Sequence, residues 1–125
     1  MIREPVRKFE ELLVWQKGIT LVKKVYLCTL AEAFRRDFGL TDQLRRAAVS
    51  IPTNIAEGFE RSSRKEYLNY LNIAKGSAGE VRSLLRVALE VGYIEKDNHD
   101  QLRDSVLEVS CYLSNQMKSL KGVHQ

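Results

Sequence analysis

The central part of the chain carries a strict seven-residue repeat of apolar positions. The spacings alternate between four and three residues over Tyr67, Leu71, Ala74, Ala78, Val81, Leu85 and Ala88. This repeat is typical of a helix that packs in a left-handed bundle, because it keeps one apolar stripe against the neighbouring helices. Ser63 and Glu66 form a capping box before the repeat and Gly92 follows it, so we expect a helix over about residues 64–91.

The N-terminal part of the chain predicts another long helix. Its apolar positions recur at spacings of three and four residues, which is typical of an amphipathic helix over about residues 10–33. The expected buried stripe consists of Leu12, Trp15, Ile19, Val22, Tyr26 and Leu30. The pattern stops over residues 34–39, and we expect Gly39 to be the turn residue.

A further helix is predicted over about residues 41–58. Thr41 and Asp42 offer N-cap side chains at its start. Its expected buried stripe consists of Leu44, Ala47, Ala48, Ile51 and Ile55. Pro52 lies inside this stripe, and we expect it to kink the helix without ending it, because the apolar period continues beyond it.

The C-terminal quarter predicts the last helix, over about residues 97–121. Asp97 is the expected N-cap, and Asp100 falls in the first turn, where the helix dipole favours an acid. The expected buried stripe consists of Leu102, Val106, Val109, Leu113 and Leu120. Four helices with short connections in 125 residues predict a single all-α domain over residues 1–125, an antiparallel up-down four-helix bundle.

The composition excludes several other classes of protein. Hydrophobic residues make up 44% of the chain, which is ordinary for a folded protein and argues against disorder. The two cysteines lie far apart and form no Cys-x-x-Cys motif, so no disulfide framework or zinc ribbon is expected. Neither a signal-peptide core nor a run of ~18 apolar residues is present. We therefore expect a cytoplasmic protein that does not cross a membrane.

Small and surplus apolar residues point to close neighbours. Gly76 and Gly79 lie inside the helix predicted over residues 64–91, where each costs about 1 kcal/mol relative to alanine, so we expect another backbone close by. That backbone belongs either to the helix over residues 41–58, which the small residues there favour, or to another subunit. Several apolar residues lie outside the stripes: Leu13, Val14, Leu21, Val25, Leu27, Leu84, Val87, Leu89 and Leu107. This surplus favours self-association over scattered surface residues.

Basic residues are concentrated in the middle of the chain. The formal net charge is +4, and residues 35–65 hold seven cations against four acids, whereas residues 87–125 are net acidic. Six of the seven central cations are arginine, whose planar fork suits contact with phosphate. The candidate nucleic-acid contacts are Arg45, Arg46, Arg61, Arg64, Lys65, Arg82 and Arg86. The alternative is a solvated surface with ion pairs inside the chain, such as Arg46–Glu57, Arg64–Glu60 and Arg82–Glu80.

One polar motif lies inside the helix predicted over residues 41–58. It consists of Ser50, Pro52, Asn54, Glu57 and Gly58. An enzyme would use Glu57 as a general base and Arg46 as an anion clamp. The alternative is a structural network in which polar side chains bond the backbone freed by Pro52 and Glu57 pairs with an arginine. No nucleophile–base pair, phosphate loop or Glu-x-x-His pattern is present, so we expect no catalysis, metal or cofactor.

Three segments of the chain resemble a known bacterial family. They are residues 9–16, 38–58 and 67–80, and the most specific is the block QLRRAAVSIPTNIAEG at residues 43–58. Over about residues 9–120 the chain resembles the four-helix bundle proteins encoded in intervening sequences of 23S ribosomal RNA genes. It departs from many members at Gly79, where they have a larger helix former before the glutamate.

The resemblance implies an antiparallel bundle that assembles as a homopentamer, a ring with a central channel. The family is similar to the accessory variability determinant of diversity-generating retroelements, a basic pentamer that binds a reverse transcriptase and nucleic acid. Two hypotheses follow for this chain. In the first, a non-enzymatic ring binds RNA or a ribonucleoprotein partner, such as a reverse transcriptase, through its arginines. In the second, an adaptor ring binds another protein and has no nucleic-acid role.

Overall fold

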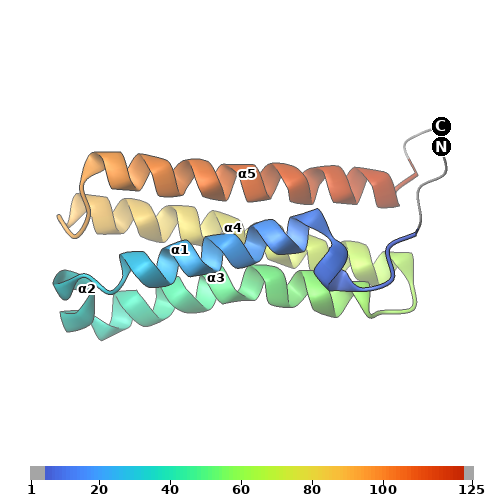
Figure 1. Ribbon diagram of the computed structural model, residues 1–125, viewed down its shortest axis with the longest axis horizontal. Coiled ribbons are helices and arrows are strands. Elements are labelled where there is room, and N and C mark those ends of the chain that lie inside the picture. The colour runs from blue at the N-terminus through green and yellow to red at the C-terminus, as the bar shows by residue number, and fades with distance from the viewer. Residues whose placement is uncertain (1–4, 123–125) are drawn as a thin grey trace.

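Four long helices and two short ones make up the described part of the protein. The computed structural model describes residues 5–122 and places no strand in that range. The elements, in chain order, are the 3-10 helix η1 (Phe9–Glu11), α1 (Leu13–Cys28), α2 (Glu32–Arg36), α3 (Phe38–Phe59), α4 (Arg64–Glu90) and α5 (Lys96–Leu120). The long helices alternate in direction along the bundle (Figure 1). The prediction of an all-α antiparallel bundle is therefore confirmed.

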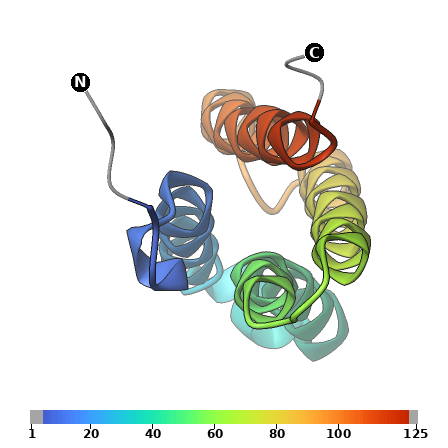
Figure 2. The same ribbon diagram turned by 90° about the vertical axis from the view of Figure 1, so that its right-hand side faces the viewer.

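The long helices lie at the corners of a four-sided bundle. Around it they follow the order α1, α3, α4 and α5, and each packs against its two neighbours in that order (Figure 2). The α3–α4 and α4–α5 contacts are the most extensive. No helix within residues 5–122 combines the length and the apolar character that a membrane span needs.

Three of the four predicted stripes form the core. In α4 every residue of the seven-residue repeat is buried. The stripe of α3 is buried throughout, and that of α5 is buried from Leu102 to Leu113, whereas Leu120 is half-buried. Pro52 lies within α3, which continues beyond it as expected. In each of these helices only one apolar stripe runs the full length, so its period identifies the core directly.

The first helix differs from its prediction in both extent and face. Leu12 has extended backbone dihedrals and separates η1 from α1, which ends at Cys28. Its buried residues are Val14, Gly18, Leu21 and Val25, whereas the predicted Ile19, Tyr26 and Leu30 are exposed by 41%, 41% and 59%. Two apolar stripes of the same period compete on α1. The one containing Gly18 is buried because a Cβ there would lie only 3.4 Å from Cβ of Pro52, so the helices approach closely.

The short helix α2 lies between α1 and α3, and a side chain caps the start of α3. Gly39 lies inside α3 and is not a turn residue. Asp37 is the N-cap, and Oδ1 of its carboxylate accepts the backbone N–H of Leu40 at 3.1 Å. Thr41 and Asp42 therefore do not cap the helix. Oδ2 of Asp37 accepts the hydroxyl of Tyr93 at 2.9 Å, and these bonds lower the pKa of Asp37 and raise that of Tyr93.

The remaining helix ends agree with the sequence except at α5. Oγ of Ser63 accepts the backbone N–H of Glu66 at 3.0 Å, as the capping box predicts. Gly92 follows α4 with φ of +82°, a conformation that favours glycine. Asp97, however, lies inside α5, and Glu95 occupies the N-cap position without a side-chain bond.

Candidate nucleic-acid interface

The predicted basic residues do not form one cluster, and Arg45 is held within the fold. Its Nε donates to Oγ1 of the buried Thr29 at 2.8 Å, and its guanidinium lies 4.5 Å from the ring centre of Tyr26. Arg46 is 80% exposed and pairs with Asp42 at 2.8 Å, one turn away on α3. The predicted Arg46–Glu57 pair is therefore wrong.

Arg61 is also held, at the opposite end of α3. It donates to Glu57 at 3.1 Å and to the hydroxyl of Tyr70 at 2.6 Å. Glu57 thus pairs with an arginine, as the structural interpretation of the motif expects, but with Arg61. Gly58 lies against Tyr70 and Tyr67, since a Cβ there would come within 2.6 Å and 3.0 Å of their atoms.

The rest of the polar motif is a network between α3 and α4. Nδ2 of Asn54 donates to the carbonyl oxygen of Ser50 at 2.8 Å and to its hydroxyl at 2.9 Å. The hydroxyl of Ser50 in turn bonds that of Ser77 on α4 at 2.9 Å. These residues therefore stabilise the α3–α4 contact. Asn54 bonds the carbonyl of Ser50 and not that of Ala48, whose usual helical donor is missing because Pro52 has no N–H.

The groove between α4 and α5 collects basic side chains along its length. Near the start of α4, a hollow of about 610 Å³ is lined by Lys65, Glu66, Leu68, Asn69, Asn72, Met117 and Lys121, which are two cations, one acid and four uncharged residues. Farther along, Nζ of Lys75 donates to Oγ of Ser114 at 2.8 Å and bridges the two helices.

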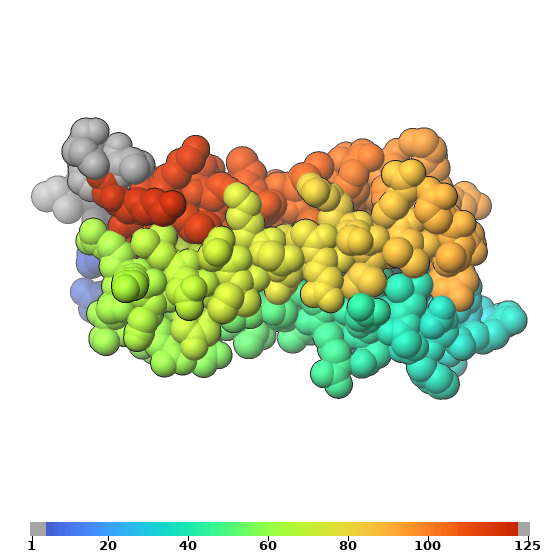
Figure 3. Space-filling view, turned by 180° about the vertical axis from the view of Figure 1, so that it is seen from behind, coloured from blue at the N-terminus to red at the C-terminus, as the bar shows by residue number. Residues whose placement is uncertain are grey.

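A second hollow, of about 380 Å³, lies near the end of α4. Its lining residues are Gly79, Arg82, Ser83, Arg86, His99 and Arg103. We call the two hollows and the Lys75–Ser114 bridge between them the α4–α5 groove. Figure 3 shows the face of the molecule on which α4 crosses the middle and α5 lies along one edge. From Lys65 to Arg86 the groove extends roughly 32 Å, at 1.5 Å per helical residue.

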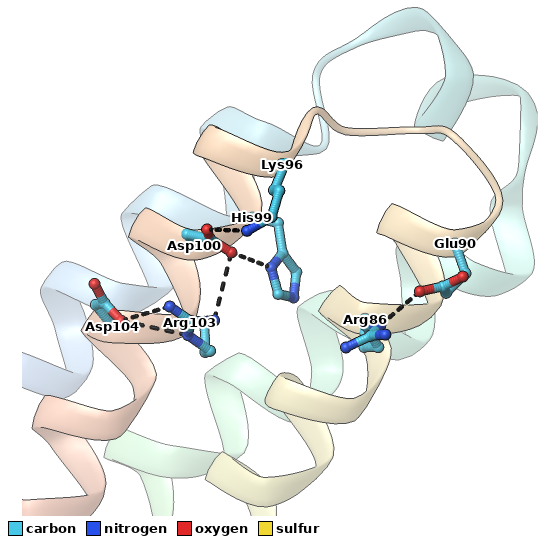
Figure 4. Close-up of polar contacts among 7 residues, drawn as sticks. All are labelled: Arg86, Glu90, Lys96, His99, Asp100, Arg103 and Asp104. Carbon is cyan, nitrogen blue, oxygen red and sulfur yellow. Dashed lines mark hydrogen bonds and ion pairs between the residues drawn. The ribbon is translucent and has the colours of Figure 1, made fainter.

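Acidic residues hold part of this basic set in place. Arg86 pairs with Glu90 through Nε at 2.7 Å, and Arg103 contacts Asp100 at 3.4 Å and Asp104 at 3.2 Å (Figure 4). The hydrogen bond from Lys96, followed by that from His99, holds the pKa of Asp100 at about 2, below its ordinary 3.8.

Three candidate cations have no acidic partner among residues 5–122. They are Arg64, Lys65 and Arg82, so the predicted pairs Arg64–Glu60 and Arg82–Glu80 are not formed. Lys65 and Arg82 line the α4–α5 groove. Of the seven candidates, the groove thus brings together Lys65, Arg82 and Arg86, and Arg64 adjoins Lys65 in the chain.

The groove also contains residues that the sequence analysis did not select. They are Lys75, His99, Arg103 and Lys121. Sequence spacing could have identified Lys75. Lys75 and Arg82 are seven residues apart, as are Gly79 and Arg86, and the buried stripe of the same helix has this spacing. The spacing does not identify the α5 residues, because their position in the groove depends on which helix lies beside α4.

Two apolar surfaces remain exposed. The α1–α3 groove, a hollow of about 330 Å³, is lined by Phe9, Trp15, Ile19, Val22, Val49, Pro52, Thr53 and Ala56. The bundle-end patch consists of Leu27, Leu30, Phe38 and Val91, which are 61%, 59%, 82% and 55% exposed. A hollow of about 770 Å³ opens beside this patch, between the end of α1 and the start of α5.

The two mid-helix glycines of α4 face open space. A Cβ at Gly76 or Gly79 meets nothing within 4 Å. The expectation that helix α3 approaches them within the same chain is therefore wrong. The close approaches occur instead at Gly18 and Gly58.

Comparison with known proteins decides the family. The family model described as 23S rRNA-intervening sequence protein matches residues 10–115. The chain belongs to this family. The match includes the polar motif and the whole α4–α5 groove except Met117 and Lys121.

A solved structure supports the same conclusion. The protein is similar to a crystal structure of a protein with unknown function from the S23 ribosomal protein family of Bacteroides thetaiotaomicron. The two are 26% identical with a TM-score of 0.77, over 85% of this chain and 99% of the other. No curated protein matches the chain.

Proposed function

We propose that this member of the 23S rRNA-intervening sequence family is a non-enzymatic homo-oligomer that binds the phosphate backbone of RNA in the α4–α5 groove. The observation that carries the proposal is the line of cations supplied by two helices along that groove. Lys65, Lys75 and Arg82 come from α4, and Arg103 and Lys121 come from α5. Cations in a row along a groove match the regular charges of a nucleic-acid strand.

The mode of binding follows from the kind of side chains present. The groove offers charged groups and amides such as Asn69 and Asn72, but its lining among the described residues includes no phenylalanine, tyrosine or tryptophan on which bases could stack. Contacts to phosphate carry no sequence information of their own. We therefore expect binding that depends little on sequence and weakens steeply as salt is added.

Self-association is supported by the exposed apolar surfaces. The α1–α3 groove places Trp15, Ile19, Val22 and Val49 at the surface of a single chain. Clustered apolar side chains of this kind are typical of surfaces that another protein covers. A second copy of the chain is the proposed occupant, and the family resemblance implies five copies in a ring. In a ring each groove is repeated around one axis, which concentrates a modest charge.

A catalytic role has little support in the polar motif. The enzyme interpretation requires Glu57 and Arg46 to act together. They are eleven residues apart on α3, roughly 16 Å along the helix at 1.5 Å per residue. Each instead pairs with a partner one turn away on the helix surface.

The test uses a matched pair of charge reversals. Arg86 and Arg46 are both exposed helix residues with an acidic partner four residues away, but only Arg86 lines the groove. We expect Arg86→Glu to weaken binding of a single-stranded RNA and to lower its salt dependence, by a slope of about 0.7 for each phosphate that the variant no longer neutralises. Arg46→Glu should leave both unchanged.

Light scattering on the same samples gives the mass of the assembly. A mass of several protomers with salt-sensitive RNA uptake supports the proposal. RNA binding that is equal in the groove variant and the Arg46→Glu control contradicts it.

The bundle-end patch favours a second candidate function, an adaptor that binds another protein. Phe38 is the most exposed large apolar residue at 82%, and Leu27 beside the hollow is 61% exposed. An adaptor of this kind should lose its partner on Phe38→Ser but keep it on reversal of Arg64 and Lys65 to glutamate. An RNA-binding protein should keep its RNA on Phe38→Ser and lose it on reversal of Arg64 and Lys65 to glutamate.

A further inference from the structure

His99 lies on the floor of the second hollow of the α4–α5 groove. The residue is only 4% exposed, and its Nδ1 bonds Oδ1 of Asp100 at 3.0 Å. Its other ring nitrogen, Nε2, has no hydrogen-bond partner among the described residues. No buried side-chain nitrogen or oxygen in residues 5–122 lacks a partner, so Nε2 is not fully buried, and the residue belongs to the lining of the hollow. Figure 4 shows the ring projecting from α5 between Arg103 and Arg86.

Three arginines, Arg82, Arg86 and Arg103, line the same hollow as His99. Arg82 has no acidic partner among the described residues, and Arg86 uses only Nε for Glu90, which leaves its terminal nitrogens available. Arg103 approaches from α5, where Asp100 and Asp104 fix its position. An arginine carries five N–H donors, so each retains donors for a ligand. The hollow is therefore lined by guanidinium donors from two helices.

The position of the hollow also matters. The α4–α5 groove ends here, because α4 ends at Glu90 and α5 begins at Lys96. The connection between the two helices lies just beyond them (Figure 4). A strand lying in the groove reaches its end at this hollow.

We propose that this hollow is a phosphomonoester site, which takes the terminal phosphate of an RNA strand lying in the α4–α5 groove; the inference rests on the proposed function. A terminal phosphate carries a charge of about −1.5 to −2 at pH 7 and offers three strong acceptor oxygens. An internal phosphodiester carries only one negative charge. Three guanidinium groups and an imidazole suit the terminal group better, because charge-assisted contacts of this kind strengthen with ligand charge.

His99 gives the site a signature of its own. An ionised carboxylate only accepts, so Nδ1 beside Asp100 carries a proton, and in the neutral ring Nε2 is an acceptor. A ligand that enters the hollow should therefore change the NMR signal of this ring.

The experiment compares one RNA sequence with three kinds of end. A twelve-nucleotide single strand is prepared with a 5′-phosphate, with a 3′-phosphate, and with hydroxyl groups at both ends, and its affinity for the full chain is measured by fluorescence anisotropy. We expect one phosphorylated form to bind about tenfold more tightly, or about 1.4 kcal/mol. Arg82→Gln should remove this preference, and Arg46→Gln should preserve it. Uridine 5′-monophosphate in excess should also remove it.

A second measurement uses the unaltered protein. The chain has two histidines, His99 and His124, so the ring signals can be assigned with a single His124→Gln variant. The phosphorylated RNA should shift the Nε2 signal of His99, and the hydroxyl-ended RNA should not. Equal affinity for all three RNAs overturns the inference and leaves the proposed function standing. Failure of every RNA to bind overturns both.

Discussion

Gly58 and Gly76 provide a matched test of the packing described above. Both lie inside long helices, so replacement by alanine improves the helix propensity at each position, by up to about 1 kcal/mol. Their surroundings are opposite. A Cβ at Gly58 would lie 2.6 Å from Cβ of Tyr70 and 3.0 Å from Cδ1 of Tyr67, whereas one at Gly76 meets nothing within 4 Å.

The magnitudes follow from these distances. A contact of 2.6 Å to a carbon next to the backbone requires helix α4 to move, and overpacking of this kind costs about 1–3 kcal/mol. Gly58→Ala should therefore destabilise the protein, because this cost exceeds the helix-propensity gain near the end of α3. Gly76→Ala should stabilise it by about 0.5–1 kcal/mol. We expect the two variants to differ by about 2 kcal/mol.

Urea unfolding followed by helical circular dichroism measures this difference. The protomer concentration is held constant, because association changes apparent stability. An unchanged slope with urea indicates that the two variants unfold through the same transition. A Gly58→Ala variant as stable as the unaltered protein refutes the close contact with Tyr70. A Gly76→Ala variant that is destabilised shows that another molecule covers this face of α4 in solution.

Three further predictions concern stability. Ser63→Ala removes the side-chain acceptor for the backbone N–H of Glu66 and should cost about 1 kcal/mol in the same urea assay; no loss would mean that water replaces the cap. Phe34→Ala empties a fully buried ring position and should cost about 3–5 kcal/mol, and a cost below about 1 kcal/mol would contradict its burial. The pKa of Asp100 is lowered in the folded protein to about 2, so its contribution to stability is complete above its ordinary pKa of 3.8 and is lost as the pH falls toward 2. Asp100→Asn should therefore reduce the fall in the free energy of unfolding between about pH 4 and pH 2. An unchanged dependence on pH would exclude the bond from Lys96.

Much of the fold could be predicted because in three of the long helices only one apolar stripe runs the full length. The seven-residue repeat of α4 is buried throughout, and its capping box and Gly92 mark its two ends. The first helix could not be predicted in the same way. It carries two apolar stripes of equal period, and the choice between them depends on Gly18 fitting against Pro52, a contact between helices that periodicity does not contain.

The candidate site was predictable to a smaller extent. Lys65, Arg82 and Arg86 are among the predicted contacts and do line the groove, because they lie on one helix whose orientation the repeat fixes. Arg45 and Arg61 are instead engaged with Tyr26 and Tyr70, which charge counting along the chain does not reveal.

The residues that α5 adds to the groove depend on a different kind of information. Arg103 and His99 belong to a segment that is acidic overall. A count of charges by segment therefore does not identify them as part of a basic groove. Only the packing of α5 beside α4 places them in a basic groove. Local charge in a bundle is therefore a property of helix pairs.

The two bonds of Asp37 can form only at different stages of the synthesis of the chain. One carboxylate oxygen accepts from Leu40, three residues away, and the other accepts from Tyr93, 56 residues away. A nascent chain that has emerged only as far as α3 can form the first bond but not the second. The start of α3 is thus tethered to the turn after α4 only when that turn has left the ribosome, so this end of the bundle is completed late in translation.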